Sequence, residues 1–152
     1  ALKLDPNHAA SLFRLGVLYA QQQDYTDAVD AWKHYIAATH SSATGYGNLG
    51  FCYELMRLPD QAEAAYKQGI EQDPKNQLCR VNYGLMLAKN GDVNQAIDQF
   101  QAVLTPAEAH YNLGSVYQEQ GKRSQAKLEY ERSLQLDPTM FDAQQRLAAL
   151  TD

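Results

Sequence analysis

The stretch Asn48-Leu49-Gly50-Phe51-Cys52-Tyr53 decides the fold, because its pattern returns along the whole chain. Its glycine belongs to a series with successive spacings of 34, 34 and 30 residues: Gly16, Gly50, Gly84 and Gly114. An alanine stands twelve positions after each glycine, and an aromatic residue stands four positions beyond each alanine. The pairs are Ala28 and Trp32, Ala62 and Tyr66, Ala96 and Phe100, and Ala126 and Tyr130. Landmarks that share one period predict a repeat protein rather than one globular domain.

Each repeat predicts two helices. Near the glycine, apolar residues recur three or four positions apart, as in Leu12, Leu15 and Tyr19, which is the spacing of an amphipathic helix. A second pattern of the same kind follows: Ala28, Val29, Trp32 and Ile36. One helix pair cannot bury its own apolar face, so the repeats are expected to stack, with the four aromatic residues in the core.

Turn and capping residues separate the predicted helices. Gly91 and Gly121 stand in turns, where glycine supplies the left-handed conformation that often ends a helix, whereas the second repeat has Arg57 instead. The Asp-Pro pairs at 5–6, 73–74 and 137–138 are expected to begin the next repeat, with aspartate as N-cap and proline at the first helical position. Thr105 and Glu108 predict a capping box.

With the pattern Leu-Gly-x-x-Tyr, then alanine, an aromatic residue and Asp-Pro, the whole chain resembles the tetratricopeptide repeat family. The resemblance implies an all-α fold, a right-handed superhelical solenoid of antiparallel helix pairs forming a single array over residues 1–152. The expected parts are the tail of a preceding repeat at 1–8, repeats at 9–42 and 43–76, a shortened repeat at 77–106, a repeat at 107–140, and a C-terminal capping or partial-repeat helix at 141–152.

Composition excludes several classes of function. The 152 residues carry a formal net charge of -5, whereas a nucleic-acid binder normally presents a basic face to the phosphates. No apolar run approaches the roughly 20 residues that cross a bilayer, so no membrane span is expected. The four histidines are scattered and two cysteines form no ligand motif. We therefore predict no catalytic site, no metal site and no cofactor, and hence no enzyme.

The chain begins inside a repeat, without an initiator methionine, which suggests a fragment of a longer protein. A targeting signal can therefore not be assessed, and the compartment stays open. Two cysteines favour a reducing compartment such as the cytoplasm slightly over an oxidising one.

The resemblance implies that the first helices of successive repeats line a concave groove. Helical spacing then predicts the groove residues opposite the packed face: Phe13, Arg14, Val17, Asn48, Phe51, Leu55, Val81, Asn82, Leu85, Lys89, Tyr111, Asn112 and Ser115. Stacking is expected to place Asn48, Asn82 and Asn112 in a row. A carboxamide offers a donor and an acceptor, which matches the backbone of an extended peptide. The alternative is that these asparagines are merely solvated.

The predicted function is a non-catalytic protein-interaction scaffold that binds an extended or helical peptide of an unidentified partner. Carboxylate tails of Hsp70 or Hsp90 are not expected, because the family's clamp positions carry Phe13, Val17 and Leu78 instead of cations. One alternative is an architectural module that self-associates into homo-oligomers. Another is a substrate-recruiting arm of a larger enzyme.

Overall fold

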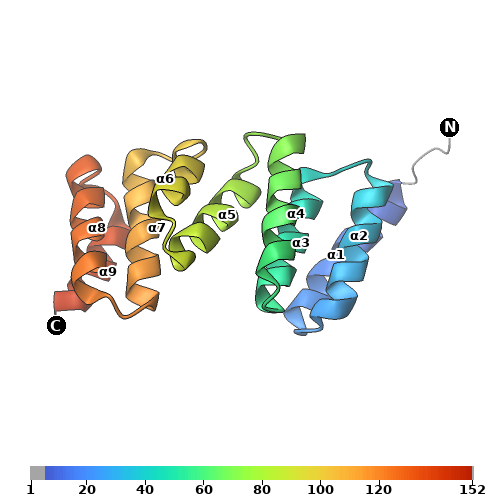
Figure 1. Cartoon of the computed structure of the whole chain (residues 1–152), viewed down its shortest axis with the longest axis horizontal. Coiled ribbons are helices and arrows are strands. Elements are labelled where there is room, and N and C mark those ends of the chain that lie inside the picture. Colours follow the sequence, from blue (N-terminus) through green and yellow to red (C-terminus); the bar gives the residue numbers. More distant parts are fainter. Residues whose placement is uncertain (1–5, 152) are drawn as a thin grey trace. The chain divides into compact units, whose positions relative to one another are not determined.

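In the computed structural model, which describes residues 6–151, every regular element is an α-helix (Figure 1). The helices are α1 (Pro6–Gln21), α2 (Tyr25–Ala38), α3 (Ala43–Leu55), α4 (Pro59–Gln72), α5 (Gln77–Asn90), α6 (Val93–Gln101), α7 (Pro106–Glu119), α8 (Arg123–Leu136) and α9 (Phe141–Thr151). The predicted all-α class is confirmed.

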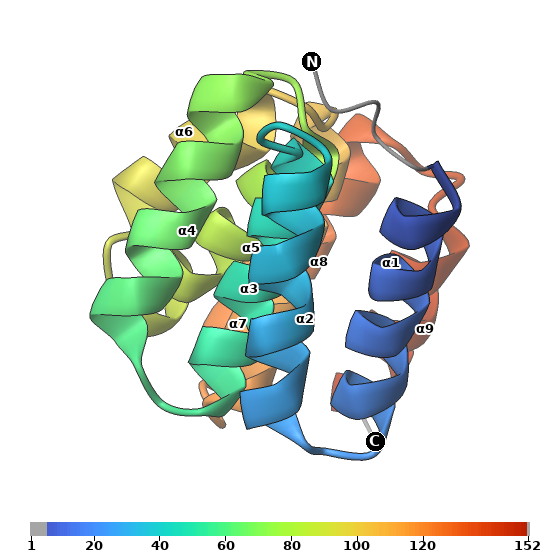
Figure 2. The ribbon, with the colours of Figure 1, turned by 90° about the vertical axis from the view of Figure 1, so that its right-hand side faces the viewer.

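The helices form two compact units, of which one ends at Asn82 and the other begins at Tyr83, within α5. In the first unit α2 packs against both α1 and α3, and α3 packs against α4. Figure 2 shows that these four helices run alternately up and down. In the second unit α7 packs against α6 and α8, and α8 packs against α9.

A glycine and an aromatic ring hold each helix pair together. A Cβ atom added to Gly50 would lie 2.6 Å from a ring carbon of Tyr66, and one on Gly114 would lie 2.6 Å from Tyr130. Gly16 and Gly84 meet Trp32 and Phe100 in the same way, at 2.5 Å. All four rings are at most 1% exposed, which confirms their predicted place in the core.

The turn inside each pair requires a left-handed residue. Gly91 and Gly121 have φ of 96° and 72°, as predicted, but Gln23 and Arg57 adopt φ of 63° and 59° at the equivalent positions. A side chain in this conformation costs roughly 1–2 kcal/mol relative to the right-handed one. Two of the four turns therefore store strain that glycine would relieve.

The predicted role of the Asp-Pro pairs as N-caps is wrong at 73–74 and 137–138. Asp73 and Asp137 instead end α4 and α8, since their backbone N–H groups donate to Gly69 and Ser133. Each carboxylate accepts a hydrogen bond from a backbone N–H two residues on, which favours a turn over a helix start. The pair at 5–6 has its aspartate outside the described residues. The Thr105 capping box is confirmed.

Leu15 does not occupy the buried place that its repeat position predicts. Leu49 and Leu113, its counterparts, are 6% and 2% exposed, whereas Leu15 is 40% exposed. The helices of these counterparts, α3 and α7, each pack against the second helix of the pair before them, and no such helix precedes α1 in the described residues. The period of the repeat thus fixes which face is apolar, but a neighbouring helix must be present to bury it.

Candidate functional site

The predicted groove residues of α1 lie together but differ in burial. Phe13, Arg14 and Val17 line a shallow hollow of about 370 Å³ with Leu18 and Gln21. Phe13 is half-buried, and its ring meets the rings of Trp32 and Tyr35 edge-on, with centroids 5.2 and 5.5 Å apart. Val17 also packs against the core. These residues therefore stabilise the first helix pair as well as lining its surface.

The groove residues of α3 combine a fixed amide with exposed apolar side chains. Asn48 is half-buried, and its Nδ2 donates to the carbonyl of Thr44 in the same helix at 2.9 Å. Phe51 and Leu55, one and two helical turns nearer the end of α3, are 45% and 42% exposed. We call the surface of the first unit that carries Phe13, Val17 and Leu18 of α1 and Asn48, Phe51 and Leu55 of α3 the first-helix face.

The predicted residues of α5 fall in both units. Val81 and Asn82 are half-buried and belong to the first unit, while Leu85 is half-buried and belongs to the second. Lys89 is exposed and pairs with Glu119 of α7 at 3.5 Å. Because Asn82 and Asn112 belong to different units, the alignment of the three asparagines in one row stays a prediction.

In the second unit, α7 repeats the arrangement of α3 with different neighbours. Asn112 Nδ2 donates to the carbonyl of Glu108 at 2.9 Å, which is the counterpart of the Asn48 bond. The half-buried Tyr111 ring lies 5.8 Å from that of Tyr130, and its hydroxyl is hydrogen-bonded to Arg146 of α9, which raises the pKa of the guanidinium. The Ser115 hydroxyl oxygen lies 3.4 Å from that of Tyr130.

Sequence reasoning missed the acceptors that serve the two buried tyrosines. Tyr66 donates to Glu54 Oε1 at 2.5 Å, and burial together with this bond raises the pKa of the phenol. Tyr130 donates to Gln118 Oε1 at 2.7 Å. Both acceptors stand four residues after the repeat glycine. The signal was present in the sequence, since the repeats whose core ring lacks a hydroxyl carry alanine there: Ala20 and Ala88.

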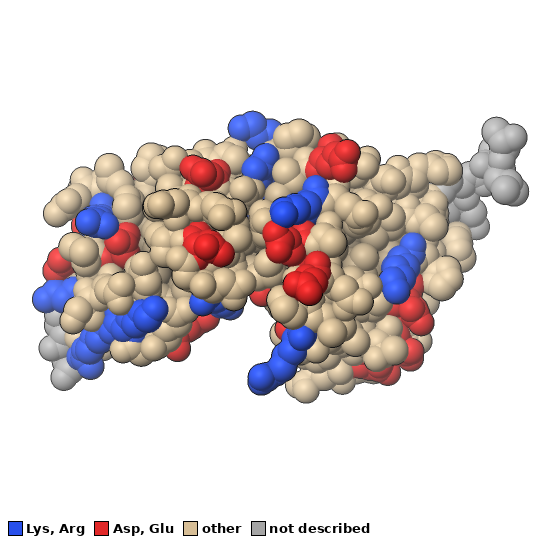
Figure 3. All heavy atoms as spheres, viewed as in Figure 1, with Lys and Arg blue, Asp and Glu red and all other residues tan. Residues whose placement is uncertain are grey.

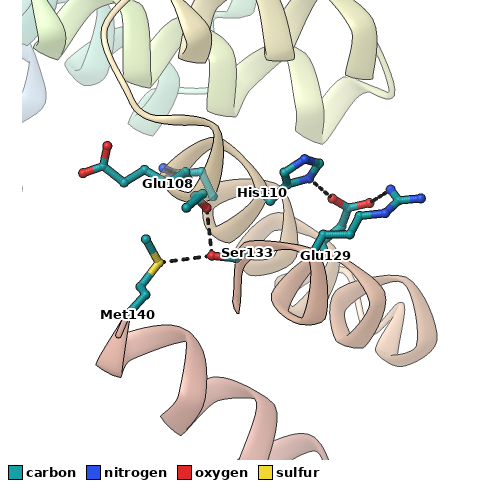
Figure 4. Close-up of polar contacts among 8 residues, drawn as sticks. Glu108, His110, Glu129, Ser133 and Met140 are labelled. Atoms are coloured by element: carbon teal, nitrogen blue, oxygen red, sulfur yellow. Dashed lines mark hydrogen bonds and ion pairs between the residues drawn. The ribbon is translucent and has the colours of Figure 1, made fainter. Parts of the chain in front are cut away.

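A charged cluster between α7 and α8 was also missed (Figure 4). The Glu129 carboxylate is 7% exposed and lies between His110 Nδ1 and Arg132 Nη1, each 2.7 Å away. Nearby, the buried Ser133 hydroxyl donates to the carbonyl of Ala107 at 2.8 Å. The Glu129 carboxylate is therefore paired twice instead of hydrated.

Both cysteines are buried, free thiols with little nucleophilic character. Burial raises the pKa of Cys52, and it raises the pKa of Cys79 to about 11. The thiolate is the reactive form, so these side chains are nearly all protonated at neutral pH. Over residues 6–151, no group of three potential ligands could hold a metal ion. Nor does any helix in that range have the length and apolarity to cross a membrane.

Sequence models of the tetratricopeptide repeat match residues 1–41, 43–76, 65–98 and 107–140. The chain is 28% identical over 142 residues to the BBSome complex member BBS4 of Bos taurus, covering 91% of this chain and 23% of that protein. It is 28% identical over 127 residues to the human PEX5-related protein, covering 74% and 20%. The chain thus spans about a quarter of the length of the curated relatives it matches.

Solved structures share the fold at low sequence identity. TTC0263, a thermophilic TPR protein of Thermus thermophilus, has a TM-score of 0.72 and 21% identity, covering 99% of this chain and 84% of that one. YrrB, described as a TPR protein with an unusual peptide-binding site, has a TM-score of 0.64 and 24% identity, covering 95% and 76%.

Proposed function

The chain belongs to the tetratricopeptide repeat family, whose repeats indicate a protein-interaction scaffold, and from that premise we propose that it binds a peptide of a partner protein over its first helices. An extended peptide segment lies with its backbone on the asparagine of one unit and its apolar side chains on the residues around that asparagine. The relatives support a protein partner, since BBS4 is a member of a complex and YrrB has a peptide-binding site.

The observation that carries this proposal is the matched state of two asparagines. Asn48 and Asn112 are both half-buried, and each donates one N–H to the carbonyl four residues earlier in its own helix. Because this bond already fixes the plane of the carboxamide, binding a peptide costs little further side-chain entropy. A carboxamide has a second N–H and an acceptor oxygen, which are the groups that recognise a peptide C=O and N–H. Each such bond contributes about 0.5–1.5 kcal/mol.

Apolar contacts supply most of the affinity in this proposal. Phe51 and Leu55 on α3 and Leu18 on α1 are each more than 40% exposed. Burying their apolar surface under a ligand contributes roughly 25 cal/mol per Å². The first-helix face thus favours peptides with apolar side chains near an unobstructed backbone, and we expect uncharged or weakly charged sequences to bind best.

Peptides selected from a random display library against the intact chain supply the probe for the test. We expect calorimetry to show about five- to 150-fold weaker binding to Asn48→Ala/Asn112→Ala, from the loss of two hydrogen bonds. Gln72→Ala/Gln125→Ala, two exposed amides on the second helices, is the matched control and should bind normally. Equal affinity of the asparagine variant and the unaltered chain would refute the proposed recognition.

Self-association is the second candidate, because large apolar side chains are exposed near both ends of the described residues. Leu15 and Leu18 on α1 are 40% and 46% exposed, and Leu136 and Phe141 around the last turn are 55% and 63% exposed. Exposed apolar surface of this kind favours contact between copies. Light scattering over a concentration series tests this candidate. The average mass of the unaltered chain should rise with concentration, whereas Leu15→Gln/Phe141→Gln should keep the mass of a monomer.

A further inference from the structure

The first unit has a second hollow, on the side of the molecule formed by α2 and α4. It measures about 360 Å³ and lies between these two helices, with α3 as its floor. The floor and walls are apolar or aromatic, and the rim is polar. The lining consists of Ile36, Tyr46, Leu49, Tyr53, Ala64 and Ala65, and the rim of Lys33, Gln61 and Gln68.

Small side chains keep this hollow open. Ala65 at its base is 3% exposed, and Ala64 beside it is exposed. The equivalent positions of the fourth repeat carry Glu129 and Leu128, which have larger side chains. The hollow is therefore a property of this repeat's residues and does not follow from the repeat geometry alone.

The walls are held in place before any ligand arrives. A Cβ atom on Gly45 would lie 2.7 Å from Ile36 Cγ1, and one on Gly69 would lie 3.1 Å from Tyr46 Cβ. α2 and α4 are thus seated on α3 in contacts that leave the two wall residues little room to move. A pre-formed site loses less entropy on binding than one that must be ordered.

The rim carries one charge sign. Lys33 is exposed and has no ion-pair partner among residues 6–151, and no acidic residue lines the hollow. On α4, Glu63 and Lys67 form an ion pair with each other at 2.6 Å. Figure 3, which views this side of the molecule, shows both signs of charge over α4 and over α2. A cation at the rim attracts an anionic group.

We propose that this hollow binds one aromatic side chain of a partner peptide whose next residue is acidic, with the ring between Tyr46 and Tyr53 and the carboxylate on Lys33. The volume lies within the range of ligand sites and has room for an aromatic side chain. The tyrosine rings offer edge-to-face contacts to an inserted ring. Gln61 and Gln68 can hydrogen-bond the peptide backbone at the rim. None of these residues belongs to the first-helix face, so the inference does not depend on the proposed function.

Two blocked tetrapeptides test the site, Gly-Phe-Asp-Gly and its uncharged analogue Gly-Phe-Asn-Gly, titrated to millimolar concentration against the ¹⁵N-labelled chain. We expect saturable amide shifts in α2, α3 and α4 around Ile36, Tyr46 and Ala64. The acidic peptide should bind about two- to fivefold more tightly, as exposed ion pairs allow. Lys33→Gln should abolish that preference while leaving the affinity for the uncharged peptide unchanged.

A filling variant separates this site from non-specific binding. Ala64→Leu installs the side chain of the fourth repeat at an exposed position and should weaken both peptides by about tenfold or more. Ala37→Leu, an exposed alanine of α2 outside the hollow, is the matched control and should change nothing. The proposal is overturned by the absence of saturable shifts, by shifts centred on Asn48 and Phe51, by unchanged affinity in Ala64→Leu, or by a preference for the acidic peptide that survives in Lys33→Gln.

Discussion

The α3–α4 pair and the α7–α8 pair have the same residues at their centre and different residues on the side of α4 and α8. Gly50 with Tyr66 and Gly114 with Tyr130 pack almost identically. On that side, however, Tyr46, Ala65 and Gln68 border a hollow, while their counterparts His110, Glu129 and Arg132 form a charged cluster. The same helix-pair backbone therefore carries an open apolar site in one pair and a closed polar contact in the other.

A second difference shows how the two pairs solve one problem with different helices. The carbonyl of Ala43 accepts a bond from Cys79 Sγ of the following helix at 3.2 Å, next to Gly69. The equivalent carbonyl of Ala107 accepts from Ser133, which stands where the first unit has Gly69, and Ala143 replaces the cysteine. In the second unit, Ser133 thus stands in place of Gly69, and Ala143 stands in place of Cys79.

The largest expected effect tests the part that the two pairs share. Gly50→Leu and Gly114→Leu each force a side chain into a ring that a Cβ atom alone would approach to 2.6 Å. Each should lower the free energy of unfolding by about 3 kcal/mol or more, measured by urea denaturation. A cost below about 1 kcal/mol at either site would show that the pairs are not locked by this contact.

A transplant of the charged cluster tests the part that differs. Ala65→Glu alone puts a carboxylate at a buried site without partners and should cost about 2 kcal/mol. Tyr46→His/Ala65→Glu/Gln68→Arg supplies both partners and should recover most of that loss in the same urea assay. If the triple variant is no more stable than Ala65→Glu, the cluster depends on more than these three side chains.

A double-mutant cycle tests the exchange of hydrogen-bond donors. Gly69→Ser alone brings a Cβ atom to 2.4 Å from Cys79 Sγ, and Cys79→Ala alone removes the donor to Ala43. Gly69→Ser/Cys79→Ala recreates the arrangement of the second unit. Its loss of stability should therefore be smaller than the sum of the single losses by about 1 kcal/mol or more. Strict additivity would mean that the two positions do not compensate each other.

The smallest expected effect concerns the turns. Arg57→Gly should stabilise the chain by about 0.5–1 kcal/mol, because it removes left-handed strain that outweighs glycine's entropy in the unfolded state. Gly121→Ala, at the equivalent turn, should destabilise it by about 1 kcal/mol. Thermal unfolding followed by circular dichroism measures both changes, and shifts of the same sign would contradict the account.

The sequence predicted what the repeat period determines. The helix pairs, the four core rings and the Gly91 and Gly121 turns follow from local residues that recur at fixed spacing. The Asp-Pro prediction failed because aspartate can cap the next turn of backbone as readily as it can start a helix. Both outcomes use the same residue types, so composition alone does not separate them.

The predicted surface was harder to derive. Phe13 was expected only in the groove, but its ring also packs on Trp32. A residue at the border between two faces of a helix contacts both. Only the spatial neighbours His110 and Arg132 explain the burial of Glu129. The hollow beside Ala65 depends on the sizes of side chains from three helices. Such features arise from contacts between elements, which no single periodic pattern contains.

Amide shift mapping with a display-selected peptide on the ¹⁵N-labelled chain tests the proposed function most directly. We predict that the largest shifts fall on α1 and α3, at Val17, Asn48 and Phe51, and on α7 around Asn112. Shifts confined to α2, α4 and α8, or to the ends around Leu15 and Phe141, would contradict peptide binding over the first helices.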